Sequence, residues 1–493
     1  MFAVACGGSA KHSPEPVPTT KPVASPAASK PTQVDAKALK SQLEPFIDSL
    51  SQGLGDAHKF SGFVFVAQGD KVVYERAWGY ANYATKALAD RNTSFRIGSV
   101  TKQFTAVAIL QLQDKGLLSV HDKVRKHLPK YPAVADKVTI HHLLTHTGGV
   151  PNFTNDRALM KRRGNETSVP DLLATFSAKK LDFEPGSKFS YSNSGYAVLG
   201  AIIEAVSKKS YHDYLRDHVF TPAGLTRTLY GDAKGADNRA KGYREHNGKL
   251  APAKKFAMSM AYAAGGVRST AADLWRWHKA IETDAILSAA ARKQMYTPFK
   301  KNYAYGWAVR DVKGKRIIAH DGGIDGFSTS YLRLVTDDVT IVAWTNNPGQ
   351  PAGAAARSVA QIVMGKKVKP LTFDAIPDAL AKRVIGSYVP DKESAERLTK
   401  LAGKQMLESV AVMDIERRGA GLVSNPIGQP ALPLSHKKGL VFELKRVRAT
   451  FTFKSATPDG VATGFSLSQG GATFSFVRDE TKAAAIKAKR KAP

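Results

Sequence analysis

Three short motifs place reactive side chains in an order that suits chemistry at a serine hydroxyl. Ser99 and Lys102 form an S-x-x-K pattern at the start of an apolar run, Tyr191 and Asn193 follow a Glu-Pro-Gly turn, and His320 opens a glycine-rich stretch. A lysine three residues after a serine lies on the same helical face as the hydroxyl. The positive end of a helix favours an alkoxide, and a buried lysine that loses its proton can act as a base. The pattern therefore predicts a nucleophilic serine with a lysine partner.

The S-x-x-K pattern occurs three times, so the surrounding sequence must decide which copy is reactive. The copy at 177–180 lies at the polar end of a predicted helix, and the copy at 435–438 precedes a predicted strand. Only Ser99 follows a β-rich hairpin pattern and opens a run that is apolar nearly all round, which is typical of a buried helix. The other two motifs also have second copies, at 80–82 and 146–148. Tyr191 and His320 are preferred because of the sequence around them: Tyr191 follows a turn, and His320 ends a β-rich run and enters a glycine-rich stretch.

The elements that must position these residues are β-rich at both ends and helical in the middle. Residues 60–81 predict a hairpin and residues 99–115 a buried helix that stops at Gly116. Residues 119–230 are mostly helical and loop, and alternating β-rich runs return at 303–346. This order predicts an α/β (α+β) fold, in which an antiparallel sheet from both ends of the domain is flanked by helices and carries a helical insertion.

Composition divides the chain into four predicted parts. Residues 1–35 contain six prolines and are expected to form an extended tether. The run VACGG at 4–8 resembles the end of a bacterial lipoprotein signal, so Cys6 is the expected lipidation site. The signal is truncated, because only five residues precede Cys6 and a full signal needs a longer apolar stretch. The alternative is a chance match in a plain disordered tail. Residues 36–365 form the sheet domain, residues 380–478 predict an all-β barrel or sandwich, and residues 479–493 form a basic tail.

Five ordered stretches of the sequence resemble the serine β-lactamase and D-alanyl-D-alanine carboxypeptidase superfamily, in its class-C-like branch of β-lactamases, D-aminopeptidases and esterases. They are FRIGSVTKQFTAVAIL (95–110), HHLLTHTGGVPNF (141–153), FEPGSKFSYSNSGYAVLGAIIE (183–204), AAGGVRSTAADLWRW (263–277) and HDGGIDGFST (320–329). The resemblance covers about residues 40–365 and implies a β-lactamase/transpeptidase-like fold. The C-terminal module resembles the β-barrel domain that is often appended in this branch.

The resemblance implies a role for each side chain of the first two motifs. Ser99 is the nucleophile that forms an acyl-enzyme, and Lys102 lowers its proton affinity and takes its proton. Tyr191 carries a proton from the nucleophile to the leaving group. Asn193 orients Lys102 and holds the substrate amide.

The third motif supplies backbone groups and one departure from the β-lactamase pattern. The N–H groups of Ser99 and Gly323 are expected to form the oxyanion hole, with Gly322 beside them. His320 stands where the β-lactamases carry the lysine of K-T-G, which holds the substrate carboxylate. An unperturbed histidine is mostly neutral at pH 7 and anchors a carboxylate poorly, so efficient β-lactam hydrolysis is not expected. The alternatives for His320 are the H-x-G role seen in esterases and aminopeptidases, or a structural histidine.

The charge balance bears on location and partners. Lysine and arginine number 72 and aspartate and glutamate 42, which gives a net charge of +30. No zinc-finger, RNP or helix-turn-helix signature accompanies this charge, so no nucleic acid is expected as a partner. The basic surface suits envelope polymers or lipid headgroups, and no run reaches the ~20 apolar residues that span a bilayer, so the expected membrane contact is a lipid anchor only. A single cysteine excludes a thiolate zinc site, and neither metal nor cofactor is expected.

The sequence thus predicts a serine hydrolase of the bacterial cell envelope, acting through an acyl-enzyme. Its expected substrate is a small molecule or peptide, such as a D-amino-acid peptide derived from peptidoglycan, an ester or a β-lactam-like compound. Loops at 154–180 and 226–262 are expected to shape the pocket. Two alternatives are a catalytically silent ligand-binding lipoprotein of the same fold, and a scaffold whose C-terminal module binds a partner or glycan.

Overall fold

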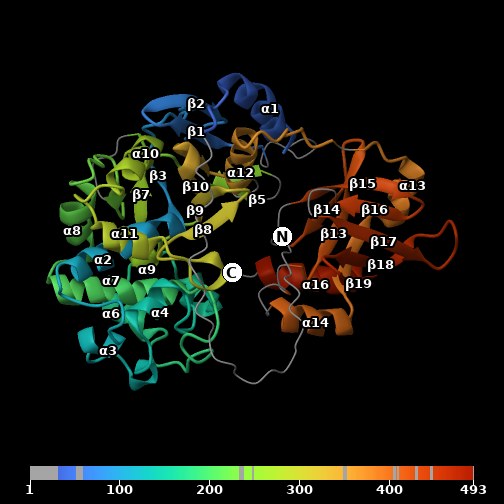
Figure 1. Cartoon of the computed structure of the whole chain (residues 1–493). Coiled ribbons are helices and arrows are strands. Elements are labelled where there is room, and N and C mark those ends of the chain that lie inside the picture. Colours follow the sequence, from blue (N-terminus) through green and yellow to red (C-terminus); the bar gives the residue numbers. More distant parts are fainter. Residues whose placement is uncertain are drawn as a thin grey trace, which may run out of the picture. The chain divides into compact units, whose positions relative to one another are not determined.

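A computed structural model of the 493-residue chain shows two compact units (Figure 1). The described residues are 31–50, 59–232, 238–246, 249–347, 352–372, 374–402, 407, 410–427, 431–444 and 448–491. Those up to Lys369 belong to the first unit, and those from Pro370 onward belong to the second. The predicted lipidation site Cys6 and residues 1–30 of the predicted tether lie outside the described residues.

The first unit is built on a six-stranded antiparallel sheet with the strand order β2-β1-β11-β10-β9-β8. The strands are β1 (Gly62–Gln68), β2 (Lys71–Trp78), β8 (Ala308–Val312), β9 (Lys315–Ile324), β10 (Phe327–Leu334) and β11 (Val339–Thr345). Phe65 of β1 pairs with Val342 of β11, so the two ends of the unit meet in the middle of the sheet. β1 and β11 are buried along nearly their whole length, which is expected of central strands covered on both faces.

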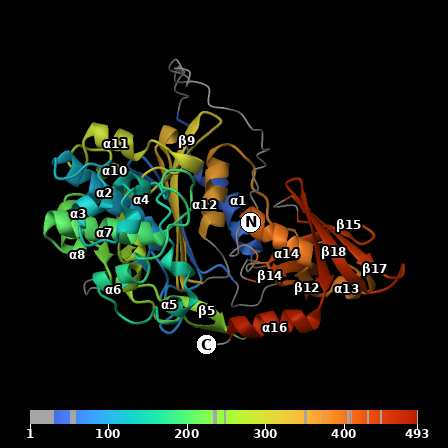
Figure 2. The same ribbon diagram turned by 90° about the horizontal axis from the view of Figure 1, so that it is seen from below.

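Helices cover both faces of this sheet. α1 (Ala36–Ser49) and α12 (Ala352–Val363) pack against each other, and α12 lies on β1, β10 and β11. On the other face, α10 (Ala271–Ala280) packs on β11. Figure 2 shows α1 and α12 on one side of the sheet and the remaining helices of this unit on the other.

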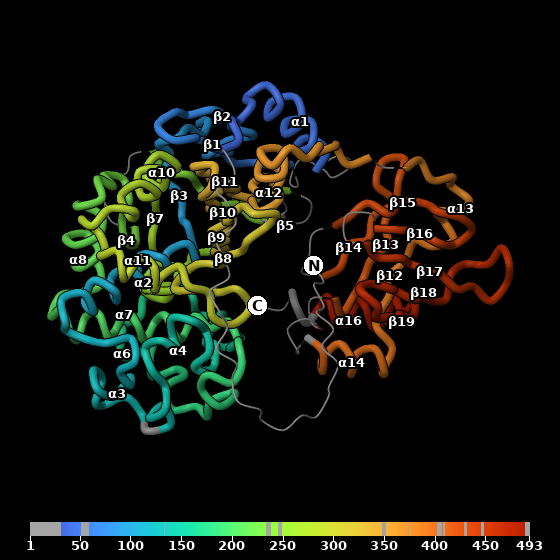
Figure 3. Tube along the Cα trace, in the orientation of Figure 1, coloured from blue at the N-terminus to red at the C-terminus, as the bar shows by residue number. Residues whose placement is uncertain are grey.

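The segment between β2 and β8 forms the helical region, whose path is followed in Figure 3. Its further helices are α2 (Lys102–Asp114), α3 (Val124–His127), α4 (Ile140–Leu144), α5 (Arg157–Lys161), α6 (Val169–Ala174), α7 (Asn193–Ser207), α8 (Tyr211–Leu215), α9 (Met258–Gly265) and α11 (Ala289–Met295). Short strands accompany them: β3 (Phe95–Arg96), β4 (Leu229–Tyr230) and β7 (Val267–Ser269) form one small sheet, and β5 (Tyr243–His246) pairs with β6 (Lys249–Pro252).

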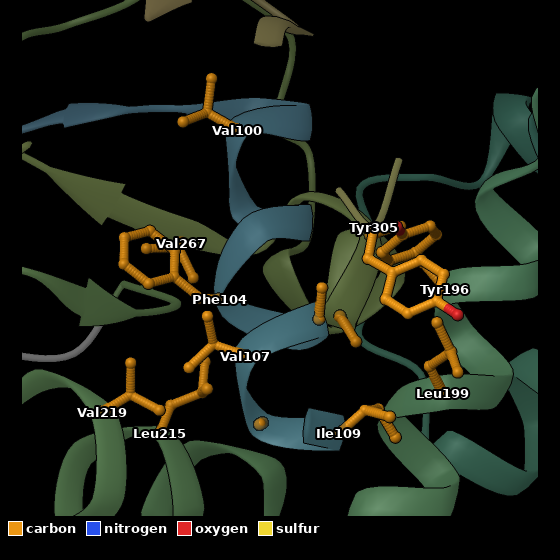
Figure 4. Close-up of a cluster of buried hydrophobic side chains, with 14 of the residues drawn as sticks. Val100, Phe104, Val107, Ile109, Tyr196, Leu199, Leu215, Val219, Val267 and Tyr305 are labelled. Atoms are coloured by element: carbon orange, nitrogen blue, oxygen red, sulfur yellow. The ribbon is translucent and has the colours of Figure 1, made fainter. Parts of the chain in front are cut away.

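Helix α2 is the central element of this region because its side chains are buried on every face. Figure 4 shows Phe104 and Val107 among residues of neighbouring elements, with Leu215 and Val219 beneath them and Val267 nearby. A helix that is apolar all round belongs in a core, as the sequence predicts. Its start differs from the prediction, since Ser99 lies in a 3₁₀ turn, η2 (Gly98–Thr101), and α2 begins at Lys102. Residues three apart eclipse in a 3₁₀ turn, so the expected proximity of the two side chains survives.

The second unit is a closed eight-stranded antiparallel barrel. Its strands are β12 (Gly386–Pro390), β13 (Met413–Arg418), β14 (Gly421–Pro426), β15 (Leu432–Lys438), β16 (Val441–Leu444), β17 (Ala449–Ser455), β18 (Ala462–Gln469) and β19 (Ala472–Arg478), with helices α13 (Asp378–Val384), α14 (Lys392–Ala402) and α16 (Glu480–Lys491). Tyr388, Phe442, Phe453 and Phe465 are among the buried side chains of its core. An eight-stranded barrel is just wide enough for side chains to fill it.

The predicted fold class is confirmed: the antiparallel sheet, its flanking helices, the helical insertion and the C-terminal β-barrel are all present. The residues predicted as a basic tail form α16 as far as Lys491. Within the described ranges, each helix is too short or too polar to cross a lipid bilayer.

Candidate active site

Ser99 stands on the turn that leads into α2, with Lys102 beside it. The Lys102 Nζ atom lies 3.2 Å from Ser99 Oγ. Gly98 has φ +51°, and a Cβ atom there would lie 2.9 Å from the backbone nitrogen of Gly323. Only glycine tolerates both conditions, so this position lets the serine turn run directly against strand β9.

Lys102 is fully buried and has three polar neighbours. Its Nζ atom lies 2.8 Å from Asn193 Oδ1 and 2.8 Å from the carbonyl oxygen of Ala264, in addition to Ser99 Oγ. Burial lowers the pKa of Lys102 well below its usual value, because an ammonium loses its hydration there. A neutral amine donates to the two oxygens that can only accept, and its lone pair then faces the Ser99 hydroxyl. This is the arrangement of a general base.

Tyr191 completes a chain of three groups. Its hydroxyl forms a hydrogen bond with Ser99, and burial raises its pKa above the usual value, so the phenol stays protonated. The rings of Tyr191 and Tyr196 lie 4.9 and 5.3 Å from Lys102 Nζ, a contact that favours an ammonium, whereas the loss of hydration acts in the opposite direction. Hydrogen bonds thus link Tyr191, Ser99 and Lys102 in one chain along which a proton can move.

Asn193 is held at the first residue of α7. Its backbone N–H donates to Asn152 Oδ1 at 3.1 Å, and its Nδ2 donates to Thr154 Oγ1 at 3.2 Å. These two bonds orient the amide so that its oxygen faces Lys102. The predicted orienting role of Asn193 therefore has a structural basis, and Asn152 and Thr154 are positioning residues that sequence reasoning missed, although they lie in or next to a stretch that carries the family resemblance.

The turn between β9 and β10 determines where the Gly323 N–H points. In a two-residue hairpin the residues that flank the turn exchange hydrogen bonds, and the next pair does not. That next pair is Gly323 and Ser328, so the N–H of Gly323 points away from β10. A Cβ atom on Gly323 would meet nothing within 4 Å, so open space adjoins this residue. The geometry suits an oxyanion hole formed with the N–H of Ser99.

Gly322 has a different position from its neighbour. It pairs with Thr329 of β10, and a Cβ atom on it would lie 2.0 Å from the carbonyl oxygen of Ile97 and 3.2 Å from the nitrogen of Ser99. The absence of a side chain here lets β9 approach the serine turn. The structure thus gives Gly322 a packing position beneath the site rather than a donor position within it.

His320 lies beside Tyr191, with both ring nitrogens occupied. Nδ1 lies 2.6 Å from the carbonyl oxygen of Asp321, which can only accept, so Nδ1 carries the proton and Nε2 accepts from the Tyr303 hydroxyl at 2.9 Å. Burial, and then the nearby Lys102, lower the pKa of His320 to about 3. A neutral imidazole with no free nitrogen suits the structural alternative. Tyr303 was missed by sequence reasoning, and no local pattern links it to His320.

His146 supports the Tyr191 loop from below. Its Nδ1 accepts the N–H of Ser192 at 3.2 Å, and its ring lies 4.1 Å from the Tyr191 ring. Burial lowers its pKa well below the usual value, so it is neutral. The contact fixes the ring that must reach Ser99.

Two cavities meet at Ser99. The first, of about 610 Å³, is bordered by Ser99, Phe153, Arg163, Asn193, Arg244, Phe256, Gly323 and Asp325, among others. The second, of about 620 Å³, is bordered by Ser99, Tyr191, Tyr303, His320 and one face of strands β8 to β10. The predicted pocket loops at 154–180 and 226–262 contribute to the first cavity only. Nowhere in the described part of the chain do three or more His, Cys, Asp or Glu side chains gather as metal ligands would.

Comparisons with known proteins identify the family of the chain and proteins of similar fold. Residues 46–364 match the Beta-lactamase family. The chain is 29% identical over 415 residues to "Penicillin-binding protein 4*" of Bacillus subtilis (strain 168), covering 77% of this chain and 90% of the relative. Its fold is similar to the octameric penicillin-binding protein homologue from Pyrococcus abyssi (TM-score 0.62, 24% identity, 88% of this chain, 99% of the other). It is also similar in fold to D-amino acid amidase from Ochrobactrum anthropi SV3 (TM-score 0.56, 22% identity, 66% and 97%).

Proposed function

The chain belongs to the Beta-lactamase family and is related to serine hydrolases, and from that premise we propose that it cleaves an amide or ester whose acyl part is a D-amino acid residue. One observation carries the proposal: Lys102 makes two contacts of 2.8 Å to pure acceptors and a third, of 3.2 Å, to Ser99 Oγ. Burial lowers the pKa of Lys102, which favours an amine that can take the Ser99 proton. The intact arrangement favours hydrolysis over silent ligand binding.

Acylation uses the chain of three groups in one direction. Lys102 accepts the Ser99 proton while Ser99 Oγ attacks the carbonyl carbon. The carbonyl oxygen becomes an anion, which the N–H groups of Ser99 and Gly323 stabilise. One such donor typically contributes about 10²- to 10³-fold to the rate.

The tetrahedral intermediate collapses when the bond to the leaving group breaks. Tyr191 gives its proton to the departing nitrogen or oxygen and becomes a phenolate. Lys102 still holds the Ser99 proton, so the Tyr191 phenolate and the Lys102 ammonium together carry no net charge. Water then enters from the side of the leaving group, gives a proton to the Tyr191 phenolate and attacks the carbonyl carbon of the Ser99 ester. When the acyl–oxygen bond breaks, Lys102 returns its proton to Ser99 Oγ, and release of the acid restores the enzyme.

The missing carboxylate anchor argues against a β-lactam as the natural substrate, and the D-amino-acid preference is supported by the fold similarity given below. β-Lactams carry a carboxylate that a lysine holds in the related β-lactamases, whereas His320 is neutral with both nitrogens occupied. The similarity in fold to a D-amino acid amidase supports the same reading. A penicillin is expected to acylate Ser99 and to be released slowly.

We also propose that the protein works in the bacterial cell envelope, held by a lipid on Cys6. The support is the sequence around Cys6 and the net charge of +30. Fractionation of the native protein and of Cys6→Ser after labelling with a palmitate analogue tests this. Equal solubility of the two proteins would contradict it.

The test of the catalytic proposal is intact-mass spectrometry after brief incubation with N-acetyl-D-alanine p-nitrophenyl ester, its L-isomer and a penicillin. The D-ester should give an adduct that decays with release of the acid, and the L-ester a weaker one. Ser99→Ala should give no adduct. An adduct that persists in Ser99→Ala would contradict the assignment of the nucleophile, and equal reaction of the two isomers would contradict the D-specificity.

A further inference from the structure

The positions of Tyr191 and Asn193 tell the two cavities apart. Tyr191 borders the second cavity but not the first, and Asn193 borders the first but not the second. Because Tyr191 protonates the leaving group under the proposed function, the leaving group lies on the side of the second cavity. The acyl part then lies beside Asn193.

The floor of the second cavity is one face of three paired strands. Ala308 of β8 pairs with Ala319 of β9, which pairs with Leu332 of β10, and Val312 and Ile317 continue the same face. Side chains two residues apart share a face of a strand, so these apolar residues share one surface with Arg310, which lies between Ala308 and Val312 and pairs with Ile317. From Asp321 back to Ile317 the strand covers roughly 13 Å at ~3.3 Å per residue.

Helix α12 supplies the opposite wall. Ala360 and Met364 border the cavity, while the helix itself packs on β1, β10 and β11. The resulting trough of about 620 Å³ lies within the range of sites that enclose a whole small ligand, roughly 300–1,000 Å³. A leaving group as small as one amino acid would leave most of it empty.

The trough carries three cations and one carboxylate. Arg310 lies on the strand face itself, and Arg357 on α12 and Lys366 beyond its end form the rim. Asp321 is the carboxylate; it accepts the Ser330 hydroxyl at 2.6 Å and lies 3.6 Å from Arg357. In the part of the chain that the structure describes, no carboxylate pairs with Arg310 or Lys366. The trough therefore has a net positive charge.

We propose, on the basis of the proposed function, that the natural leaving group is an anionic amphiphile: an apolar chain that lies along β8 and β9 and ends in an acidic group. The chain covers the apolar floor, and Arg310, Arg357 and Lys366 meet the acid. Arginine binds carboxylate and phosphate alike through paired hydrogen bonds, so both end groups fit.

The experiment varies the leaving group while the acyl group stays the same. N-acetyl-D-alanyl esters of ethanol, 1-octanol, 8-hydroxyoctanoate and 8-hydroxyoctyl phosphate are hydrolysed by the full chain, and kcat/KM is measured by acid release. The octyl ester should exceed the ethyl ester at least tenfold, because burial of only two of its six additional methylenes, at about 0.8 kcal/mol each, already gives about that factor. Each acid-ended ester should exceed the octyl ester by about tenfold again, the effect of a charge-assisted hydrogen bond. The ratio of kcat/KM for the carboxylate-ended ester to kcat/KM for the phosphate-ended ester shows which acidic group the natural leaving group carries.

Two pairs of variants locate the effect. Arg357→Gln and Lys366→Gln should remove most of the preference for an acid end, whereas Lys367→Gln, one residue beyond the rim, should not. Ala360→Trp should remove the preference for the octyl chain, and Met364→Trp provides the same test if Ala360→Trp does not fold. Equal kcat/KM for all four esters, or unchanged ratios in these variants, would overturn the inference while leaving the proposed function intact, because the ethyl ester still reports the acyl-enzyme. Failure of every ester to acylate Ser99 would overturn the proposed function.

Discussion

The two cavities on either side of Ser99 are similar in volume but differ in construction. The first is bordered by helix ends and loops of the helical region, and an ion pair of 2.7 Å between Arg163 and Asp325 lies at its edge. The second is bordered by one regular face of the sheet and by helix α12. Loops tolerate substitution and reshape easily, whereas a strand face is constrained by its pairing. We infer that the acyl specificity of this chain changes more readily in evolution than its leaving-group specificity.

The variant with the largest expected effect is Ser99→Ala, because it removes the one group that both cavities share. Loss of a serine nucleophile lowers kcat on the order of 10⁶-fold in other serine hydrolases. Steady-state ester hydrolysis measures the loss, and the circular dichroism spectrum checks that the fold is kept. Activity within tenfold of the parent would mean that the cavities meet at another nucleophile.

Tyr191→Phe should affect only the protonation of the leaving group, which lies on the side of the second cavity. An alkyl ester or an amide needs a proton on its leaving group, so its kcat/KM should fall by about 10²- to 10⁴-fold, the usual contribution of a general acid. A p-nitrophenyl ester releases a stable anion and should lose much less. Comparing the two substrates in parent and variant isolates the proton donated on this side. An equal loss for both substrates would instead assign Tyr191 to the activation of Ser99.

The pH dependence should reflect Lys102 rather than His320. The pKa of Lys102 lies well below its usual value, so the amine becomes protonated as the pH falls through that lowered pKa, and kcat/KM should then fall tenfold per pH unit. Tyr191 has a raised pKa and stays protonated beyond pH 10, so the plateau should extend into alkaline solution. His320, with its pKa lowered to about 3, should add no step near pH 6.5. The pH dependence of kcat/KM, measured on the parent and on His320→Gln, checks the roles given to Lys102 and His320. A step near neutrality that disappears in the variant would contradict them.

Sequence reasoning selected side chains that the structure places together, because their relations are local or follow from motif order. Ser99 and Lys102 are three residues apart on one turn, and motif order supplied Tyr191 and Asn193. The acceptor at Ala264 is 162 residues from Lys102, and no spacing rule connects them. The second cavity was missed for the same reason: which side chains share its floor depends on the register of three strands.

The state of His320 shows the limit most clearly. From its type alone it is a group that titrates near neutrality and can bind substrate. In the structure its state follows from burial, from the carbonyl oxygen of Asp321 and from the hydroxyl of Tyr303, which lies 17 residues earlier, shortly before β8. Only the folded arrangement of β9 against the helical region brings these together.

The smallest expected effect concerns the ion pair at the edge of the first cavity. Arg163 and Asp325 are each about a quarter exposed, and pairs of this kind typically stabilise a protein by about 0–1 kcal/mol. Arg163→Gln should therefore change the midpoint of urea unfolding only slightly. The Arg163 Nε donates to Asp325, which lies in the turn two residues beyond Gly323, so the pair connects the helical region to the strand end of the oxyanion hole.

Loss of this connection should change kcat/KM by about two- to tenfold, and by a factor that depends on the acyl group but not on the leaving group. Asp325→Asn should give the same factor, and the double variant should lose no more than either single variant, because neighbours that act only through each other are not additive. The measurement is a grid of two acyl groups and two alcohols in the parent, both single variants and the double variant. A factor that follows the alcohol instead would show that the two cavities are coupled through β9, and the separation into an acyl side and a leaving-group side would then fail.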